Sequence, residues 1–168
     1  MRRKLLLLSL LALLCATVNA QMSQFEALYI YNIAKDIGWP ESDANKDLTI
    51  VVIGDNSLYS DLAKLAQTRK VGSRTMVVSE AASINGLPAA DIVFLGEAKS
   101  GLITNLVTLQ QGKTTLIISG KAGQCTHGAG IAFVPENGKL QFQISDNNIR
   151  KNGLSASKRL ITMGIAVD

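Results

Sequence analysis

The sequence predicts an α/β domain in three layers, with a mainly parallel sheet, flanking helices and a C-terminal antiparallel β-hairpin. Two observations predict this class. Short apolar runs alternate along the chain with helical periodicities, which implies βαβ crossovers between parallel strands. Near the C-terminus, Asn137-Gly138 separates two apolar runs, and both residues tolerate the positive φ that a tight hairpin turn needs.

The first half of the domain is expected to contain two helices and two strands. A helix is predicted over 22–37, because apolar residues recur there at spacings of three and four until Trp39-Pro40 ends it. The run 48–53 is mostly β-branched and too continuous for a half-exposed strand, so it predicts a strand buried on both faces. A helix through 58–66 follows, with Asn56 or Ser57 as its N-cap, and then a strand over 75–79.

The second half continues the alternation and then changes to the hairpin. A strand is predicted over 91–95, and a helix over 99–109, where leucines share one side. Gln111-Gly112 closes this helix before a strand over 114–118. The hairpin strands are expected at 131–134 and 140–144, and two weak helical stretches within 147–165 complete the chain.

Residues 1–20 have the pattern of a secretory signal peptide. A basic start precedes an apolar block, Leu5 to Leu14, that is too short to span a bilayer, and Val18-Asn19-Ala20 fits a cleavage site. Cleavage is expected after Ala20, which leaves residues 21–168 as a single periplasmic domain. Cys15 raises the alternative of a lipoprotein, but Leu14 stands where a small residue should precede a lipidated cysteine.

The balance of charged residues does not indicate nucleic-acid binding. Of the 17 basic residues, three lie in the leader, so 14 remain against 13 acidic residues. A nearly neutral domain lacks the basic surface that binds phosphate backbones. Cys125 is the only cysteine outside the leader, so an internal disulfide is excluded and stability must come from packing.

A small-ligand site is predicted in the loops that follow the parallel strands, because ligands usually bind beyond the carboxyl ends of such strands. These loops are 54–57, 96–101 and 119–128. The candidate ligand-binding residues are Asp55, Asn56, Ser57, Ser119, Gly120 and Lys121. No metal site and no cofactor are predicted.

Two phosphate-binding patterns are incomplete. Gly112-Lys113-Thr114 has the last three letters of a P-loop, but Val107 stands where the first glycine should be, and the motif leads from a helix into a strand. The loop 119–130 has four glycines but leads into a strand, so it lacks the helix N-terminus of a dinucleotide site. A backbone-lined pocket for another small molecule stays open.

Cys125 and His127 are the one pair that suggests catalysis. A thiolate beside an imidazole can form a nucleophile pair or half of a metal site. No further ligand or orienting group stands at a suitable spacing, so packing in a loop is the favoured interpretation. A hydrolase is kept only as an alternative; no catalytic residue is predicted, and the chain is not expected to be an enzyme.

Five segments in a fixed order resemble the YfiR family of periplasmic regulators. They are the helix and turn over 28–40 (LYIYNIAKDIGWP), the strand and Gly-Asp turn over 48–55, the strand and glycine loop within 116–134, the hairpin over 136–144 and the tail over 153–160. Together they cover nearly the whole domain. No single segment is specific to the family, but the ordered set is fairly specific.

The resemblance implies a periplasmic α/β domain without catalysis of its own, often as a homodimer. Its expected partner is an inner-membrane diguanylate cyclase of the YfiN type, held inactive through its periplasmic segment, which controls cyclic di-GMP and biofilm formation. Cys125 cannot form the internal disulfide through which redox state is thought to act in that family's best-known member. The alternative is a periplasmic small-ligand sensor without a cyclase partner.

A partner surface is sought at the end of the first helix, in the basic segment 69–74 and in the tail. The candidates by position are Trp39, Arg69, Arg74, Ile149, Arg150, Leu154 and Leu160. Packing against the sheet is the alternative for most of them, and for Trp39 a plug over the sheet is favoured over a role in stacking on a ligand.

Overall fold

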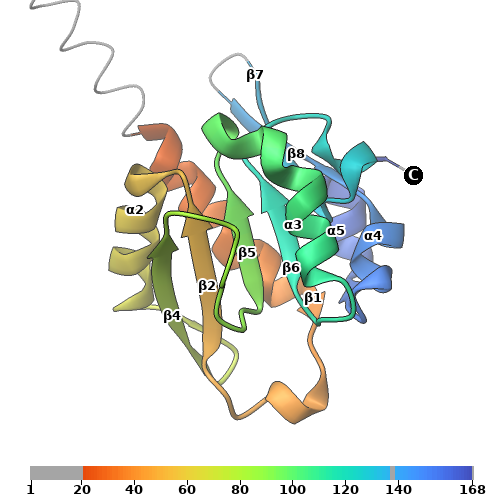
Figure 1. Ribbon diagram of the computed structural model, residues 1–168. Helices are drawn as coiled ribbons and strands as arrows, with labels where there is room; N and C mark the ends of the chain where they lie inside the picture. Colours follow the sequence, from red (N-terminus) through yellow and green to blue (C-terminus); the bar gives the residue numbers. More distant parts are fainter. Residues whose placement is uncertain (1–20, 137–138, 168) are drawn as a thin grey trace, which may run out of the picture.

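The computed structural model describes residues 21–136 and 139–167 (Figure 1). The predicted signal peptide and the predicted Asn137-Gly138 turn lie outside the described residues. A helix over 21–36, the N-terminal helix below, precedes β1. The other helices are α2 (Asn56–Ala66), α3 (Ile103–Gln110), α4 (Asp146–Lys151) and α5 (Lys158–Met163), with 3₁₀ turns η1 (Glu41–Asp43), η2 (Glu97–Leu102) and η3 (Gln124–His127).

The strands form one large sheet and one small one. They are β1 (Ile37–Gly38), β2 (Leu48–Ile53), β3 (Lys70–Val71), β4 (Arg74–Ala81), β5 (Ile92–Leu95), β6 (Leu116–Ser119), β7 (Ile131–Glu136), β8 (Lys139–Ile144), β9 (Ser155–Ala156) and β10 (Ile165–Ala166). The large sheet has the order β10-β8-β7-β6-β5-β2-β4-β3, and β1 pairs with β9. The strands from β4 to β7 are parallel, and β8 turns back antiparallel on β7, as predicted.

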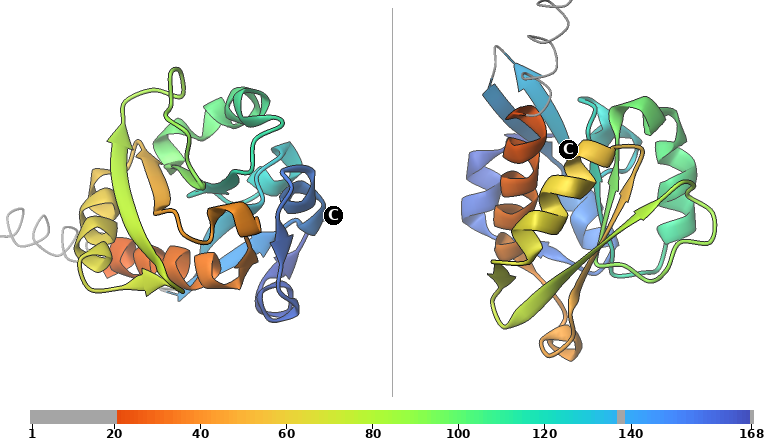
Figure 2. Two further views of the ribbon diagram at one scale, coloured as in Figure 1. Left: turned by 90° about the horizontal axis from the view of Figure 1, so that it is seen from below. Right: turned by 90° about the vertical axis from the view of Figure 1, so that its left-hand side faces the viewer.

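Two cores fill the three predicted layers, one on each face of the sheet. Ile50 and Val52 of β2 face the larger core, which the N-terminal helix, α2 and α5 cover. Val51 and Ile53 face the smaller core, which α3 covers. The right-hand view of Figure 2 shows the N-terminal helix and α2 on one side of the strands and α3 on the other. In the described part of the chain, no helix combines the length and apolarity needed to cross a membrane.

The boundaries differ from the prediction in a few places. Asp55, and neither Asn56 nor Ser57, caps α2: its carboxylate accepts from the backbone N–H of Leu58 at 2.9 Å. The helix predicted over 99–109 begins as the 3₁₀ turn η2 and becomes α-helical at Ile103. The two-residue strands β1, β3, β9 and β10 were not predicted, because two residues are too few to show an alternation.

Candidate functional site

A cleft of about 820 Å³ lies at the carboxyl end of the parallel strands. The chain passes from β2 to β4 on one side of β2 and then returns to β5 on the other side, so the strand order reverses between β2 and β5. Ligands of parallel sheets bind at such a reversal. The cleft is lined by Met22, Ser23, Glu26, Gly54, Asp55, Asn56, Ser57, Glu97, Ala98, Gly120 and Pro135.

Glycine lets the loops after β2 and β5 approach each other at this end. Gly96 donates its backbone N–H to the carbonyl of Ile53 at 2.8 Å. A Cβ atom at Gly96 would lie 2.6 Å from the carbonyl oxygen of Gly54 and 2.9 Å from its carbon, which is closer than real Cβ atoms approach. Gly54 and Gly120 contribute backbone to the lining of the cleft, beside side chains from the N-terminal helix, α2 and η2.

The cleft is acidic. Glu26 reaches it from the N-terminal helix, Asp55 from the start of α2 and Glu97 from the start of η2. Burial, and then the charges of Asp55 and Glu97, raise the pKa of Glu26 from 4.5 to about 7. No group of three histidine, cysteine, aspartate or glutamate side chains within 21–136 and 139–167 could hold a metal ion. An acidic cleft disfavours phosphates and carboxylates and favours a ligand with amine or other donor groups.

We expect Glu26→Gln to stabilise the protein above pH 7. Between pH 4.5 and about 7 the unfolded chain releases the Glu26 proton while the folded chain keeps it, so the free energy of unfolding falls as pH rises. Glutamine has no proton to release and avoids this loss. The expected gain at pH 8, discounted for the partial exposure of Glu26, is about 1–2 kcal/mol, and it disappears below pH 4.5.

Urea unfolding at pH 4 and pH 8 measures this gain. Glu41→Gln is the control, because it removes the same charge from an exposed side chain outside the cleft. An equal change in stability at both pH values for Glu26→Gln would contradict the proposed protonation of Glu26 in the folded protein.

Four of the six predicted ligand residues line this cleft: Asp55, Asn56, Ser57 and Gly120. Ser119 does not; it is fully buried, and its hydroxyl accepts from the backbone N–H of Lys121 at 3.2 Å. Lys121 is not among the lining residues. The prediction missed Glu26, because the helical period placed this residue away from the apolar side of its helix. The sequence did contain one indication of this role. Glu26 lies four residues, about one helical turn, after Met22, so both side chains are on the side of the helix that faces the cleft.

The Cys125–His127 pair does not form a catalytic arrangement. The Cys125 thiol is buried, lies 3.8 Å from the carbonyl oxygen of Gly130, and has its pKa raised by burial to about 12. It is therefore protonated at neutral pH and a poor nucleophile. The His127 ring bonds to the hydroxyl of Thr126 through Nδ1 at 3.1 Å. The hydrolase alternative thus loses its nucleophile.

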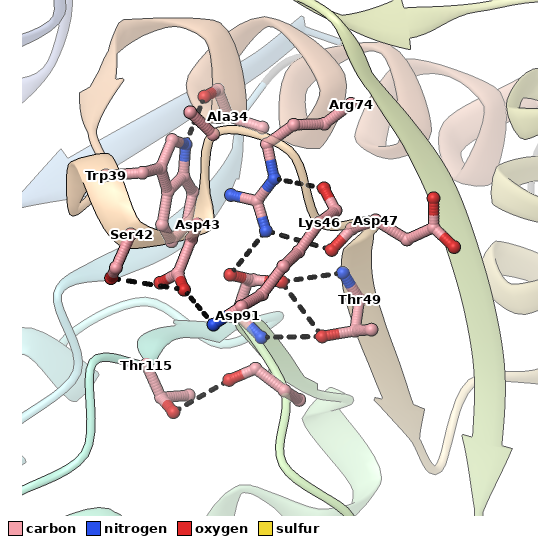
Figure 3. A network of polar contacts seen from close by, with 12 residues as sticks. Ala34, Trp39, Ser42, Asp43, Lys46, Asp47, Thr49, Arg74, Asp91 and Thr115 are labelled. Atoms are coloured by element: carbon pink, nitrogen blue, oxygen red, sulfur yellow. Dashed lines mark hydrogen bonds and ion pairs between the residues drawn. The ribbon is translucent and has the colours of Figure 1, made fainter.

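A buried ion pair closes the opposite end of the sheet (Figure 3). Arg74 Nη2 of β4 donates to Asp91 Oδ1 at 2.8 Å, and the side chains are 6% and 11% exposed. The other carboxylate oxygen of Asp91 accepts from the backbone N–H and the hydroxyl of Thr49 at 2.7 and 2.9 Å. The guanidinium lies over the ring of Trp39, 5.7 Å from the ring centroid. This network joins the start of β4 and the start of β2 to the residue before β5, and from these contacts we expect it to have a structural role.

The chain matches a family model over most of its length. The YfiR/HmsC-like family model matches residues 23–164, which include every strand except β10, the buried residues of both cores and all the cleft residues except Met22. The chain belongs to the YfiR/HmsC-like family. No curated protein matches it by sequence. The predicted resemblance to the YfiR family is therefore confirmed, and the chain is a member of a family of regulators.

For a YfiR/HmsC-like regulator, exposed residues are the ones able to contact a partner, and four of the seven predicted candidates are not exposed. Arg74, Ile149, Leu154 and Leu160 are 6%, 1%, 4% and 1% exposed. The expectation that they form a surface was wrong: Arg74 pairs with Asp91, and the three apolar side chains pack in the larger core.

The other three candidates keep some exposure. Arg69 is exposed. Arg150 is also exposed and pairs with Asp146 on its own helix. Trp39 is half-buried against the larger core and donates its indole N–H to the carbonyl of Ala34 at 2.8 Å, as a plug would.

Two of the exposed large apolar side chains lie together on the N-terminal helix. Phe25 and Leu28, one turn apart, are 41% and 44% exposed. Grooves flank them on both sides. One groove, of about 350 Å³, runs between this helix and α2 beside Leu28, and the other, of about 460 Å³, runs beside Phe25 toward Leu140 of β8. We call Phe25, Leu28 and these two grooves the helix surface.

Proposed function

We propose that this chain is a periplasmic, non-catalytic regulator that binds a membrane-bound diguanylate cyclase and represses it. Membership of the YfiR/HmsC-like family over residues 23–164 is the observation that carries the proposal. The predicted signal peptide supports an exported protein, and the buried, protonated thiol of Cys125 supports a role without catalysis. The resemblance described above supports a cyclase of the YfiN type as the partner.

Repression of this kind requires a difference in affinity. A regulator shifts its partner toward the inactive conformation only if it binds that conformation more tightly than the active one. We assign this contact to the helix surface, with the periplasmic segment of the cyclase as its occupant. Two large apolar side chains one turn apart, with a groove on each side, suit an apolar segment of a partner.

Cyclic di-GMP in a strain that lacks the gene tests the proposal. We expect its cellular level to rise relative to the parent strain and to fall again when the wild-type gene is restored. No change under several envelope stresses would contradict repression of a cyclase and would favour the ligand-binding alternative below.

Complementation with surface variants tests the docking surface. We expect Leu28→Asp to fail to restore repression, because burying a leucine contributes about 1.5–3 kcal/mol and its loss weakens binding roughly tenfold or more. Leu109→Asp is the matched control: Leu109 is 42% exposed, much like Leu28, but lies on α3 on the other side of the sheet. Equal repression by the two variants would contradict the assignment to the helix surface.

The acidic cleft favours a second candidate, a small-ligand sensor that acts with or without a cyclase. Its position at the reversal of strand order supports this alternative. A thermal-shift screen should then find stabilisation by amines or amino acids and none by nucleotides, with Glu26→Gln reducing the shift. No stabilisation at high excess of any amine would count against the sensor.

A further inference from the structure

A second cavity opens at the amino end of the parallel strands, the end opposite the acidic cleft. It has a volume of about 540 Å³ and is lined by residues within 43–49, by Arg74, and by residues within 89–91 and 112–115. These segments lead into β2, begin β4, lead into β5 and form the turn from α3 to β6, and Figure 1 shows them at the lower end of the sheet. We call this cavity the amino-end pocket.

Arg74 brings an unused hydrogen-bond donor to this pocket. Its Nε donates to the carbonyl oxygen of Lys46 at 3.0 Å, and its Nη2 donates to the carbonyl oxygen of Asp47 at 2.9 Å and to Oδ1 of Asp91 at 2.8 Å. Its Nη1 is fully buried and has no hydrogen-bond partner among the described residues. A buried charged donor without a partner is costly, so such a nitrogen at a cavity indicates a bound water, ion or ligand group.

Two lysines contribute further positive charge. The Lys46 side chain is 68% exposed and places its Nζ 2.7 Å from Oδ1 of Asp43. Figure 3 shows this flexible chain passing in front of the Arg74–Asp91 pair, where it can turn toward a ligand. Lys113 is exposed in the turn before β6, and within 21–136 and 139–167 it forms no ion pair. The pocket thus carries cationic side chains from three separate segments.

The aspartates of the pocket leave an excess of one positive charge. Two of its three carboxylates already belong to the ion pairs of Arg74 and Lys46. Figure 3 shows the third carboxylate, that of Asp47, directed away from the guanidinium. The charge of Lys113 is therefore left over. Because opposite charges attract more strongly at a partly buried site than in water, the pocket favours an anion.

We propose that the amino-end pocket binds the phosphate group of a small phosphorylated molecule, with Arg74 Nη1, Lys46 Nζ and Lys113 Nζ as its donors. Only one nitrogen of the guanidinium is without a partner, so Arg74 cannot form the two-pronged contact that holds a planar carboxylate. Donors that approach from three segments suit a tetrahedral group, which offers acceptor oxygens in several directions. The volume of the pocket leaves room for the rest of the molecule.

The Gly112-Lys113-Thr114 motif has a role in this site without being a P-loop. Gly112 has a φ of +76°, which glycine adopts readily, and the turn it forms ends α3 and brings Lys113 to the pocket. The motif leads from a helix into a strand, so the lysine acts as a point charge and not as part of a phosphate-binding loop. The site lies at the opposite end of the sheet from the acidic cleft and is independent of the proposed cyclase repression.

Fluorescence of Trp39 tests for binding. Trp39 is the only tryptophan of the chain, and the guanidinium carbon of Arg74 lies 5.7 Å from the centroid of its ring. We expect inorganic phosphate and glycerol 3-phosphate, each added to the purified protein at constant ionic strength, to cause a saturable change in emission that sodium chloride does not cause.

The two phosphate probes distinguish two forms of the same site. Tighter binding of the ester would show that the rest of the molecule also contacts the pocket, and equal binding would show that the phosphate group is recognised alone; both results support the site. The absence of saturable binding of either anion, by fluorescence and by isothermal titration calorimetry, would overturn the proposal.

Substitution of Lys113 tests one of the donors. Lys113→Gln should weaken the affinity for inorganic phosphate about tenfold, because it removes one charge-assisted hydrogen bond. Lys99→Gln is the matched control: it removes the same charge from an exposed lysine after β5, at the other end of the sheet, and should leave the affinity unchanged. Equal losses in the two variants would show an effect of net charge alone and would overturn the assignment.

Asp43→Asn should have the opposite effect. It removes the carboxylate that competes with the phosphate group for Lys46, so the affinity for inorganic phosphate should rise roughly threefold or more. Weaker binding of phosphate by this variant would overturn the proposal, because the carboxylate would then belong to a site for a cation.

The double variant Arg74→Met, Asp91→Leu tests the contribution of Nη1. It removes the guanidinium together with its buried partner, and circular dichroism shows whether it folds. Calorimetry should then detect a loss of phosphate affinity of about tenfold or more, although both lysines remain. Unchanged affinity would overturn the role of Arg74 and with it the proposed site.

The single substitutions Lys113→Gln and Asp43→Asn leave the buried pair intact, so they decide the question even if the double variant does not fold. Loss of phosphate binding in Lys113→Gln with normal control of cyclic di-GMP in complemented cells would leave the proposed function intact. The phosphate site and the repression of a cyclase can therefore fail separately.

Discussion

Replacing Asp91 with alanine is expected to destabilise the protein by about 3–5 kcal/mol. The Arg74 side chain is only 6% exposed, its Nη1 atom has no hydrogen-bond partner among the described residues, and its guanidinium carbon lies 5.7 Å from the centroid of the Trp39 ring. Without Asp91, the only hydrogen-bond acceptors left to Arg74 are the uncharged carbonyl oxygens of Lys46 and Asp47, and the carboxylate of Asp43 acts on it only through its charge. Removing one member of a buried pair leaves the other charge uncompensated in a medium of low dielectric constant.

Two variants separate this cost from other effects of the substitution. Arg74→Met together with Asp91→Leu removes both charges, so we expect much of the loss to be recovered, because apolar side chains of similar size often replace buried pairs well. Lys46→Ala is the control in the same network. It breaks the Lys46–Asp43 pair, whose lysine is 68% exposed, and should cost less than about 1 kcal/mol.

Urea unfolding followed by circular dichroism and by fluorescence of Trp39, the single tryptophan, measures all three variants. If Asp91→Ala costs no more than Lys46→Ala, the pair does not stabilise the sheet. The single changes Arg74→Met and Asp91→Leu are measured as well, and if the double variant costs as much stability as these two added together, the two side chains are not coupled. Either result would contradict the structural role assigned to the network.

The elements predicted well from the sequence are those whose burial leaves a local pattern. The continuous apolar runs at 48–53 and 114–118 correspond to β2 and β6, and the run at 91–95 to β5, within one or two residues. The short strands are different, because their neighbours supply the pairing. β10 exists because Ile165 and Ala166 lie beside Gln143 and Ile144 of β8, and no feature of two residues reveals that.

The site was predicted as far as topology determines it. Parallel strands bring the loops after β2, β5 and β6 to one end of the sheet, so the residues at Asp55 and Gly120 could be placed together. Glu26 was not placed with them, because its burial comes from loops that are distant in the sequence and only its spacing of one turn from Met22 pointed to it. Arg74 begins β4 and Asp91 directly precedes β5, the two strands that flank β2, so an arginine of the basic segment in the sequence became part of a buried pair in the fold.

Gly96→Ala is the second substitution with a large expected effect. The added Cβ would lie 2.6 Å from the carbonyl oxygen of Gly54 and 3.1 Å from that of Ile53. Both atoms belong to the backbone at the end of a central strand, so no side chain can rotate to make room. The loops after β2 and β5 must move apart, and overpacking of this kind costs about 1–3 kcal/mol or more.

Gly101→Ala is the matched control, because a Cβ there meets nothing within 4 Å and its backbone does not require glycine. It should leave stability unchanged or raise it by up to about 1 kcal/mol, through lower entropy of the unfolded chain. Urea unfolding compares the stabilities of the two variants.

Replacement of Gly96 should also change the pH dependence of stability. Because Gly96 holds together the two loops that carry Asp55 and Glu97, its replacement should weaken the electrostatic effect of these acidic groups on one another. Unfolding at pH 4 and pH 8 should then show a smaller pH dependence for Gly96→Ala than for wild type, and an unchanged one for Gly101→Ala. A Gly96→Ala protein as stable as Gly101→Ala would show that the loops can separate freely, and the cleft would then have no rigid floor on which to hold a ligand.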